Sequence, residues 1–242
     1  MKQKSTWIFL ALMFAFSFLG FPALVHLGVL RFSDRNFLHN AAFIGVMYIP
    51  ALAVWLARLI AKEDAAPLNA NVWPLPWGKV ALWAVSVPAI FFLTGLLAWA
   101  IGKTAPQWGL SELVALMDKR ATTPLPPPVH DALPALLLII GPVASALAGI
   151  TAYALTALGG EIGWRAFLLP KLLPLGQYPA YIVSGLLWGV WFSPLMWLQY
   201  RASGASEAFW PLWGCCMVLA VAGACILGET WRRTGHTGLC AV

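Results

Sequence analysis

The sequence has 242 residues, of which 61% are hydrophobic and 10% charged, and it contains 14 Trp and 13 Phe. A water-soluble domain of this size does not need so much apolar surface, so the composition excludes a soluble globular protein and indicates a polytopic membrane protein. The formal net charge of +6 is scattered along the chain and does not indicate nucleic-acid binding. In membrane proteins Lys and Arg mainly set the topology and face anionic lipid.

The chain opens with a basic stretch, 1–4, followed by an apolar run over 7–30. This run is longer than the roughly 7–15 residues of the apolar region in a cleaved signal peptide. We therefore expect it to be a retained membrane anchor.

Six apolar segments reach the length of roughly 17–25 residues that a membrane-spanning helix needs. They predict an all-α fold, a polytopic membrane helix bundle of about six transmembrane helices. The expected spans are 7–30, 41–61, 79–101, 133–158, 178–200 and 208–228.

The connections between these spans carry no sign of a second soluble domain or of a repeat. The loop after the second span contains Trp73 and Trp77, which suit a bilayer interface. In the longest connection, the stretch 111–120 predicts a short interfacial helix, followed by a stiff proline-rich spacer. We divide the chain into N-terminal transmembrane helices and loops, 1–132, and a membrane domain, 133–242.

The distribution of basic residues predicts the orientation. With six spans, nine Lys and Arg lie on the side of the N-terminus and six on the other side. The positive-inside rule then places both termini in the cytoplasm, with 158–172 near the cytoplasmic face.

Small residues suggest how the spans pack. The fourth span has a stripe of small side chains at intervals of four, ending at Gly160, and the fifth has Gly185-x-x-x-Gly189. Such stripes let helix backbones approach closely in a membrane, although an Ala-rich chain can produce them by chance. We expect the fourth and fifth spans to pack together. The four cysteines have no CxxC spacing and are expected to be small buried hydrophobic residues.

Glu161 and Arg165 stand out in the stretch "LGGEIGWRAFLLPKL", 158–172. Four residues apart on a helix, they share a face and can form an ion pair. Charges at membrane depth cost about 2.5–3.5 kcal/mol each on insertion scales, so they indicate a purpose or a partner. The structural alternative is an interfacial pair that ends the fourth span, with Arg165 extending toward water.

Three segments in order, "GEIGWRAFLLPKL", "SGLLWGVWFSPL" and "WRRTGHTG", resemble the CPBP family of intramembrane metalloproteases. This family includes the type II CAAX prenyl endopeptidases and bacterial proteins linked to bacteriocin self-immunity. The resemblance covers roughly 135–238. It implies the motifs EExxxR and FxxxH and a later His-x-x-x-Asn or His-x-x-x-Asp, from which a carboxylate and two imidazoles bind a metal ion that activates water.

The sequence departs from these motifs at their central positions. Gly160 stands where the resemblance implies the first Glu, and Phe192 stands where it implies the second-motif His. Glu161 and Arg165 remain as the remnant of the first motif, and we expect the third motif and the family's last helix to be missing. A truncated version of an active protein would account for the absence of the third motif but not for Gly160 and Phe192.

The remaining groups make poor metal ligands. A catalytic zinc typically takes three protein ligands, and His26, His39, His130 and His236 are expected to be surface or interface residues. His236 is expected at a frayed C-terminus. We therefore expect no cofactor in this chain, and zinc or another divalent metal only if the family activity is retained.

The resemblance implies a CAAX prenyl endopeptidase-related membrane protein, and the missing residues make us expect impaired catalysis. The alternatives are a non-catalytic membrane binding or immunity factor and, in another class, an accessory subunit or small transporter. The expected partners are the lipid bilayer and a membrane peptide or prenylated substrate, with no nucleic acid. The expected location is a bacterial inner membrane, as a multi-pass protein.

Overall fold

The computed structural model describes residues 2–30, 37–63, 68, 70–82, 100, 126, 128, 132, 147, 149–204 and 206–241. Contacts divide the chain into two compact units, 1–75 with 153–242, and 76–152. Within the second unit the structure describes a helical segment at 77–82 and a few positions between 100 and 152. The first unit contains the site.

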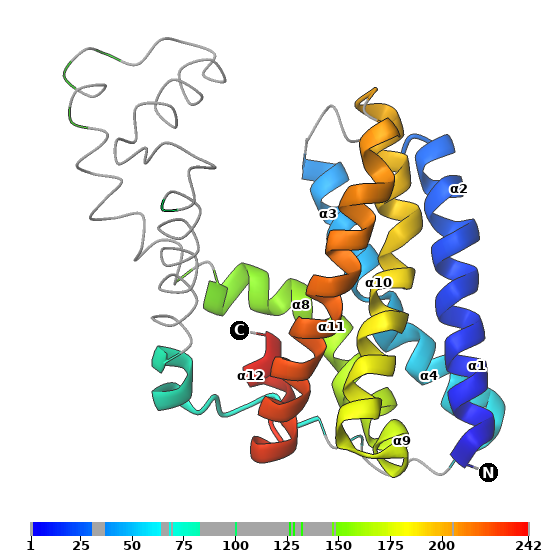
Figure 1. Cartoon of the computed structure of the whole chain (residues 1–242), viewed down its shortest axis with the longest axis vertical. Helices are drawn as coiled ribbons and strands as arrows, with labels where there is room; N and C mark the ends of the chain where they lie inside the picture. Colours follow the sequence, from blue (N-terminus) through cyan, green and yellow to red (C-terminus); the bar gives the residue numbers. More distant parts are fainter. Residues whose placement is uncertain are drawn as a thin grey trace. The chain divides into compact units, whose positions relative to one another are not determined.

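The described part of the first unit is helical, apart from turns and one isolated bridge between Asn71 and His236. This agrees with the expected all-α fold (Figure 1). The helices of the chain and their π-helical or 3-10 extensions (η) are α1 Lys2–Ala15, η1 Phe16–Gly20, α2 Phe21–His26, α3 Phe37–Met47, α4 Ile49–Ala61, η2 Gly149–Tyr153, α8 Ala154–Glu161, η3 Ile162–Leu168, α9 Leu169–Leu172, η4 Leu173–Leu175, α10 Gln177–Ala202, η5 Ser206–Ala208, α11 Phe209–Thr234 and α12 Thr237–Ala241.

Among the described residues, three helices are long and apolar enough to cross a membrane: Lys4–His26, Gln177–Ala202 and Phe209–Thr234. They correspond to the first, fifth and sixth expected spans. The expected span 79–101 and most of 133–158 lie outside the described residues. The chain is therefore a membrane protein with several long apolar helices.

The expected span 41–61 is divided into two helices, α3 and α4, with a turn at Tyr48 (Figure 1). Pro50 lies in the first turn of α4. Proline has no N–H to continue the hydrogen bonds of α3, so the helix stops and restarts there.

The core of the unit surrounds η3. Buried aromatic and aliphatic side chains from α1, α2, α4, η3 and α10 form one cluster, which includes Phe9, Phe21, Trp164, Phe167 and Trp191. Burial of such large side chains holds the site segment against the first and fifth spans.

A proline inside α10 connects this helix to the first span. Pro194 cannot donate a backbone N–H, which leaves the carbonyl of Val190 without its helical donor. The Ser193 hydroxyl donates to that carbonyl at 2.6 Å, and the buried Ser17 of η1 donates to the carbonyl of Trp191 at 2.5 Å. The π-helical turn η1 thus places its serine against the turn of α10 that precedes Pro194.

The glycines of the fifth span pack against α11. A Cβ on Gly185 would lie 2.5 Å from Cα of Val221, and one on Gly189 would overlap the side chain of Met217. The glycine face of the fifth span therefore lies against α11, while the expected packing of the fourth span on the fifth falls largely outside the described residues and stays a prediction. A stripe of small residues permits a close approach but does not identify the helix that approaches.

Candidate functional site

The site lies where α8 passes into η3. Glu161 is the last residue of α8, and Arg165 lies in the π-helical segment η3 that comes next. Arg165 Nη1 donates to Glu161 Oε1 at 2.9 Å, which confirms that the two residues form an i,i+4 ion pair. Single π-helical turns are rare and often occur at functional positions.

The pair is buried, so the alternative of an Arg165 that extends toward water is wrong. The Arg165 side chain is 2% exposed and that of Glu161 7%. On its other side the Arg165 guanidinium lies 4.8 Å from the ring centre of Trp188, in a cation–π contact. Within the described part of the chain, Glu161 Oε2 and Arg165 Nη2 have no hydrogen-bond partner. Each charge therefore depends on the other for compensation.

Three glycines beside the pair have different reasons to be glycine. A Cβ on Gly159 would lie 2.7 Å from the carbonyl oxygen of Met47, and one on Gly163 would overlap Pro50. A Cβ on Gly160 would meet nothing nearer than Trp164 Cδ1, at 3.9 Å. Close packing requires Gly159 and Gly163, whereas a Cβ atom fits at Gly160 without a clash.

Phe192 belongs to an aromatic cluster near the pair. Its ring lies 4.6 Å from that of Trp191 and 6.3 Å from that of Trp188, measured between ring centres. Trp191 in turn contacts Trp164 at 6.1 Å, and Trp188 lies under Arg165. An apolar ring thus occupies the position where the family resemblance implies an imidazole.

No sequence pattern singled out this aromatic cluster. Trp164, Trp188 and Trp191 are close in sequence to the motif residues, but spacing alone does not show that they form one cluster or that Trp188 contacts Arg165. The indole N–H groups of Trp164 and Trp191 are buried without a hydrogen-bond partner among the described residues.

The C-terminal segment is ordered against the site. Helix α12 packs on α8 and η3, and its residues Thr237–Ala241 are all buried. The Gly238 N–H donates to the Asn71 carbonyl at 3.0 Å, and Trp231 Nε1 donates to the Thr237 hydroxyl at 3.1 Å. The expectation of a frayed segment here is wrong, because these contacts join it to the rest of the unit.

His236 has both ring nitrogens engaged. Its Nδ1 accepts a hydrogen bond from the Leu239 N–H at 3.1 Å, and its Nε2 lies 2.7 Å from the Pro74 carbonyl oxygen. The tautomer that satisfies both contacts carries its proton on Nε2. This histidine caps α12 and has no lone pair left for a metal ion.

The cysteines are free thiols, and Cys240, which is buried in α12, is not suited to nucleophilic chemistry. Burial raises the pKa of the Cys240 thiol to about 12, and the negative charge of Glu161 contributes to the rise. A thiol in this state is a poor nucleophile. The expectation that all four are buried is wrong for three of them, because Cys215 is exposed and Cys216 and Cys225 are half-buried.

The described residues do not fit the three-ligand metal centre that the resemblance implies. Among them, no group of three His, Cys, Asp or Glu side chains lies close enough to hold a metal ion. Glu161 is bound to Arg165, and His26 is exposed at the end of α2. His130 and the side chain of His39 lie outside the described residues.

The helices and the buried ion pair define a helical membrane protein with a buried charged site beside an aromatic cluster. Residues 142–242 match the family model described as "Type II CAAX prenyl endopeptidase Rce1-like". The chain therefore carries an Rce1-like domain of the CPBP family over 142–242, as the sequence resemblance predicted. No curated protein and no solved structure matches the chain. The predicted domain boundary near 132 stays a prediction.

Proposed function

We propose that this Rce1-like membrane protein does not hydrolyse peptide bonds and acts as a non-catalytic membrane binding or immunity factor. The observation that carries the proposal is the state of Glu161. Its carboxylate is buried and paired with Arg165, next to an aromatic cluster that includes Phe192. With Oε1 bound to Arg165 and no two further ligands beside it among the described residues, this carboxylate does not complete a catalytic metal site.

The site residues then have structural roles. The Arg165 guanidinium compensates the Glu161 charge and stacks on Trp188, so the pair fixes the junction between α8 and η3. Breaking a buried ion pair from one side costs several kcal/mol, which accounts for the two charges staying together. The ligand class that we assign to the domain is a membrane peptide or a prenylated chain.

Proteolysis and binding can be separated in one experiment. The full-length protein, purified in detergent with added zinc, is incubated with a farnesylated peptide, and products are measured by mass spectrometry. We expect no cleavage above that of the E161Q variant. We also expect the protein to bind the farnesylated peptide more tightly than the same peptide without the farnesyl group. Cleavage that requires Glu161 would overturn the non-catalytic proposal, and equal retention of both peptides would overturn the ligand class.

We also propose that the end of the bundle where α1 begins faces the cytoplasm of a bacterial inner membrane. Ser5 of α1, Glu63 after α4 and Lys171 of α9 contact one another. Gln177 at the start of α10 donates to Glu229 near the end of α11, which brings these two helix ends together.

Six basic residues lie in or beside these segments: Lys4, Arg58, Lys62, Lys171, Arg232 and Arg233. Arg201, in contrast, lies at the opposite end of α10. The positive-inside rule supports a cytoplasmic location for this end. A reporter fused to the N-terminus should be active only where it functions in the cytoplasm. Activity of a periplasm-specific reporter at that position would reverse the orientation.

A further inference from the structure

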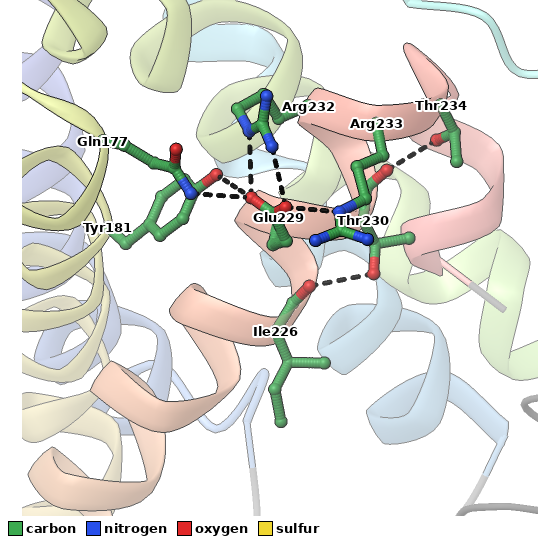
Figure 2. Close-up of polar contacts among 8 residues, drawn as sticks. All are labelled: Gln177, Tyr181, Ile226, Glu229, Thr230, Arg232, Arg233 and Thr234. Atoms are coloured by element: carbon green, nitrogen blue, oxygen red, sulfur yellow. Dashed lines mark hydrogen bonds and ion pairs between the residues drawn. The ribbon is translucent and has the colours of Figure 1, made fainter.

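The last turn of α11 carries an arginine pair held by one glutamate (Figure 2). Arg232 donates to Glu229 twice, from Nε at 2.9 Å and from Nη2 at 2.8 Å. Arg233 Nε donates to the same carboxylate. Two guanidinium groups therefore converge on a single negative charge, which leaves one positive charge in excess.

Glu229 is held in place from its other side. Gln177 Nε2 and the Tyr181 hydroxyl, both from α10, each donate to Glu229 Oε2 at 2.9 Å. In Figure 2 the carboxylate lies between these two residues and the arginines. The glutamate is thus fixed to two helices, and through it the arginines are restrained.

The arginines remain accessible although they are restrained. The side chain of Arg232 is 42% exposed and that of Arg233 72%, against 25% for Glu229. Each guanidinium has more N–H groups than the carboxylate uses, because arginine carries five donors. Two carbonyls near this helix end already accept hydrogen bonds: Trp231 O from the Gly235 N–H and Thr230 O from the Thr234 hydroxyl.

The location matches a membrane–water interface. Arg232 and Arg233 close the apolar helix Phe209–Thr234, which is long enough to span a bilayer. The neighbouring segment that pairs with 236–238 exposes Trp73, which is 70% exposed. Tryptophan and arginine together at the end of a span are typical of the headgroup layer.

We propose that Arg232 and Arg233 form a binding site for the phosphate of an anionic phospholipid headgroup. Arginine forms paired hydrogen bonds with phosphate oxygens. The carboxylate of Glu229 restrains both side chains before the lipid arrives, so less side-chain freedom is lost on binding. The site lies outside the Glu161–Arg165 pair and does not depend on the function proposed for that pair.

The test titrates dioctanoyl phosphatidylglycerol onto the full-length protein in detergent and follows the rise in melting temperature. The R233Q and R232Q variants should each bind this lipid about fivefold more weakly. The matched control is R201Q, which removes the same charge from the exposed end of α10 and should leave the affinity unchanged. Without lipid, R233Q should have the same melting temperature as the wild type, because Glu229 still accepts four hydrogen bonds from Arg232, Gln177 and Tyr181.

Three results would overturn the proposal. Equal weakening by R201Q would show that only the net charge matters. An equal response to dioctanoyl phosphatidylcholine would show that the headgroup charge is not recognised. An equal response to inorganic phosphate alone would assign the site to free phosphate and not to a lipid.

Discussion

Two glutamates of this chain have an arginine four residues further along, yet their surroundings differ. Glu161 and Arg165 are buried at the junction of α8 and η3, with side chains 7% and 2% exposed. Glu229 and Arg233 lie at the end of α11, where the arginine is 72% exposed. The common spacing produces a pair in both places, but burial decides what the pair does. The buried pair holds a fold together, whereas the exposed pair is free to meet a ligand.

The largest expected effect is at the buried pair. Arg165→Ala leaves the Glu161 carboxylate buried without compensation and should destabilise the protein by about 3–5 kcal/mol. Thermal unfolding in detergent measures the loss. The double variant E161Q/R165M removes both charges and should recover most of it. If the R165A variant had the same melting temperature as the wild type, the pair would not be structural.

Two glycines beside the buried pair give a matched comparison between a position where an added methyl group clashes and one where it does not. Gly159→Ala forces a methyl group against the Met47 carbonyl and should cost about 1–3 kcal/mol. Gly160→Ala places the same group where the nearest atom is 3.9 Å away and should cost much less. Equal loss of melting temperature for the two variants would contradict the room inferred at Gly160.

A third ion pair has intermediate burial and should give an intermediate effect. Lys171 and Glu63 are each 19% exposed, 3.5 Å apart, and both contact the buried hydroxyl of Ser5. The Lys171 ammonium also lies over the ring of Phe167. Lys171→Met keeps the apolar length and should cost about 1–2 kcal/mol through the lost charged hydrogen bonds. If Lys171→Met lost as much stability as R165A, the cost of breaking an ion pair would not follow its burial.

The smallest effect is expected at the exposed pair. Arg233→Gln should leave the melting temperature of the lipid-free protein without a resolvable change, because exposed ion pairs contribute little. Denaturation curves of R233Q and R165A, recorded in the same detergent, make the comparison directly. If R233Q proved as unstable as R165A, exposure would not separate the two regions.

The sequence predicted those parts of the fold that depend on long apolar runs. The spans at 7–30, 178–200 and 208–228 are helices because a membrane requires internal backbone hydrogen bonds along an apolar run. The division of the second span was missed, although Pro50 is a visible signal for it. No pattern marks the π-helical turns η1 and η3, which depend on contacts distant in sequence.

The candidate site was also predicted only in part, because the sequence reveals local spacing but not tertiary packing. Spacing was sufficient to pair Glu161 with Arg165, and the flanking residues were sufficient to predict the Rce1-like domain over 142–242. Burial of the pair and the rings around it come from tertiary packing, which spacing does not encode. The capping role of His236 was missed because it depends on Pro74, far away in the sequence.

The central claim is that the Glu161 carboxylate is committed to Arg165 and does not hold a metal ion. The most direct test is a zinc titration of the purified full-length protein by calorimetry, with E161Q as the control. We predict that neither the wild type nor E161Q binds zinc stoichiometrically. One zinc ion bound per wild-type chain, and lost in E161Q, would contradict the claim.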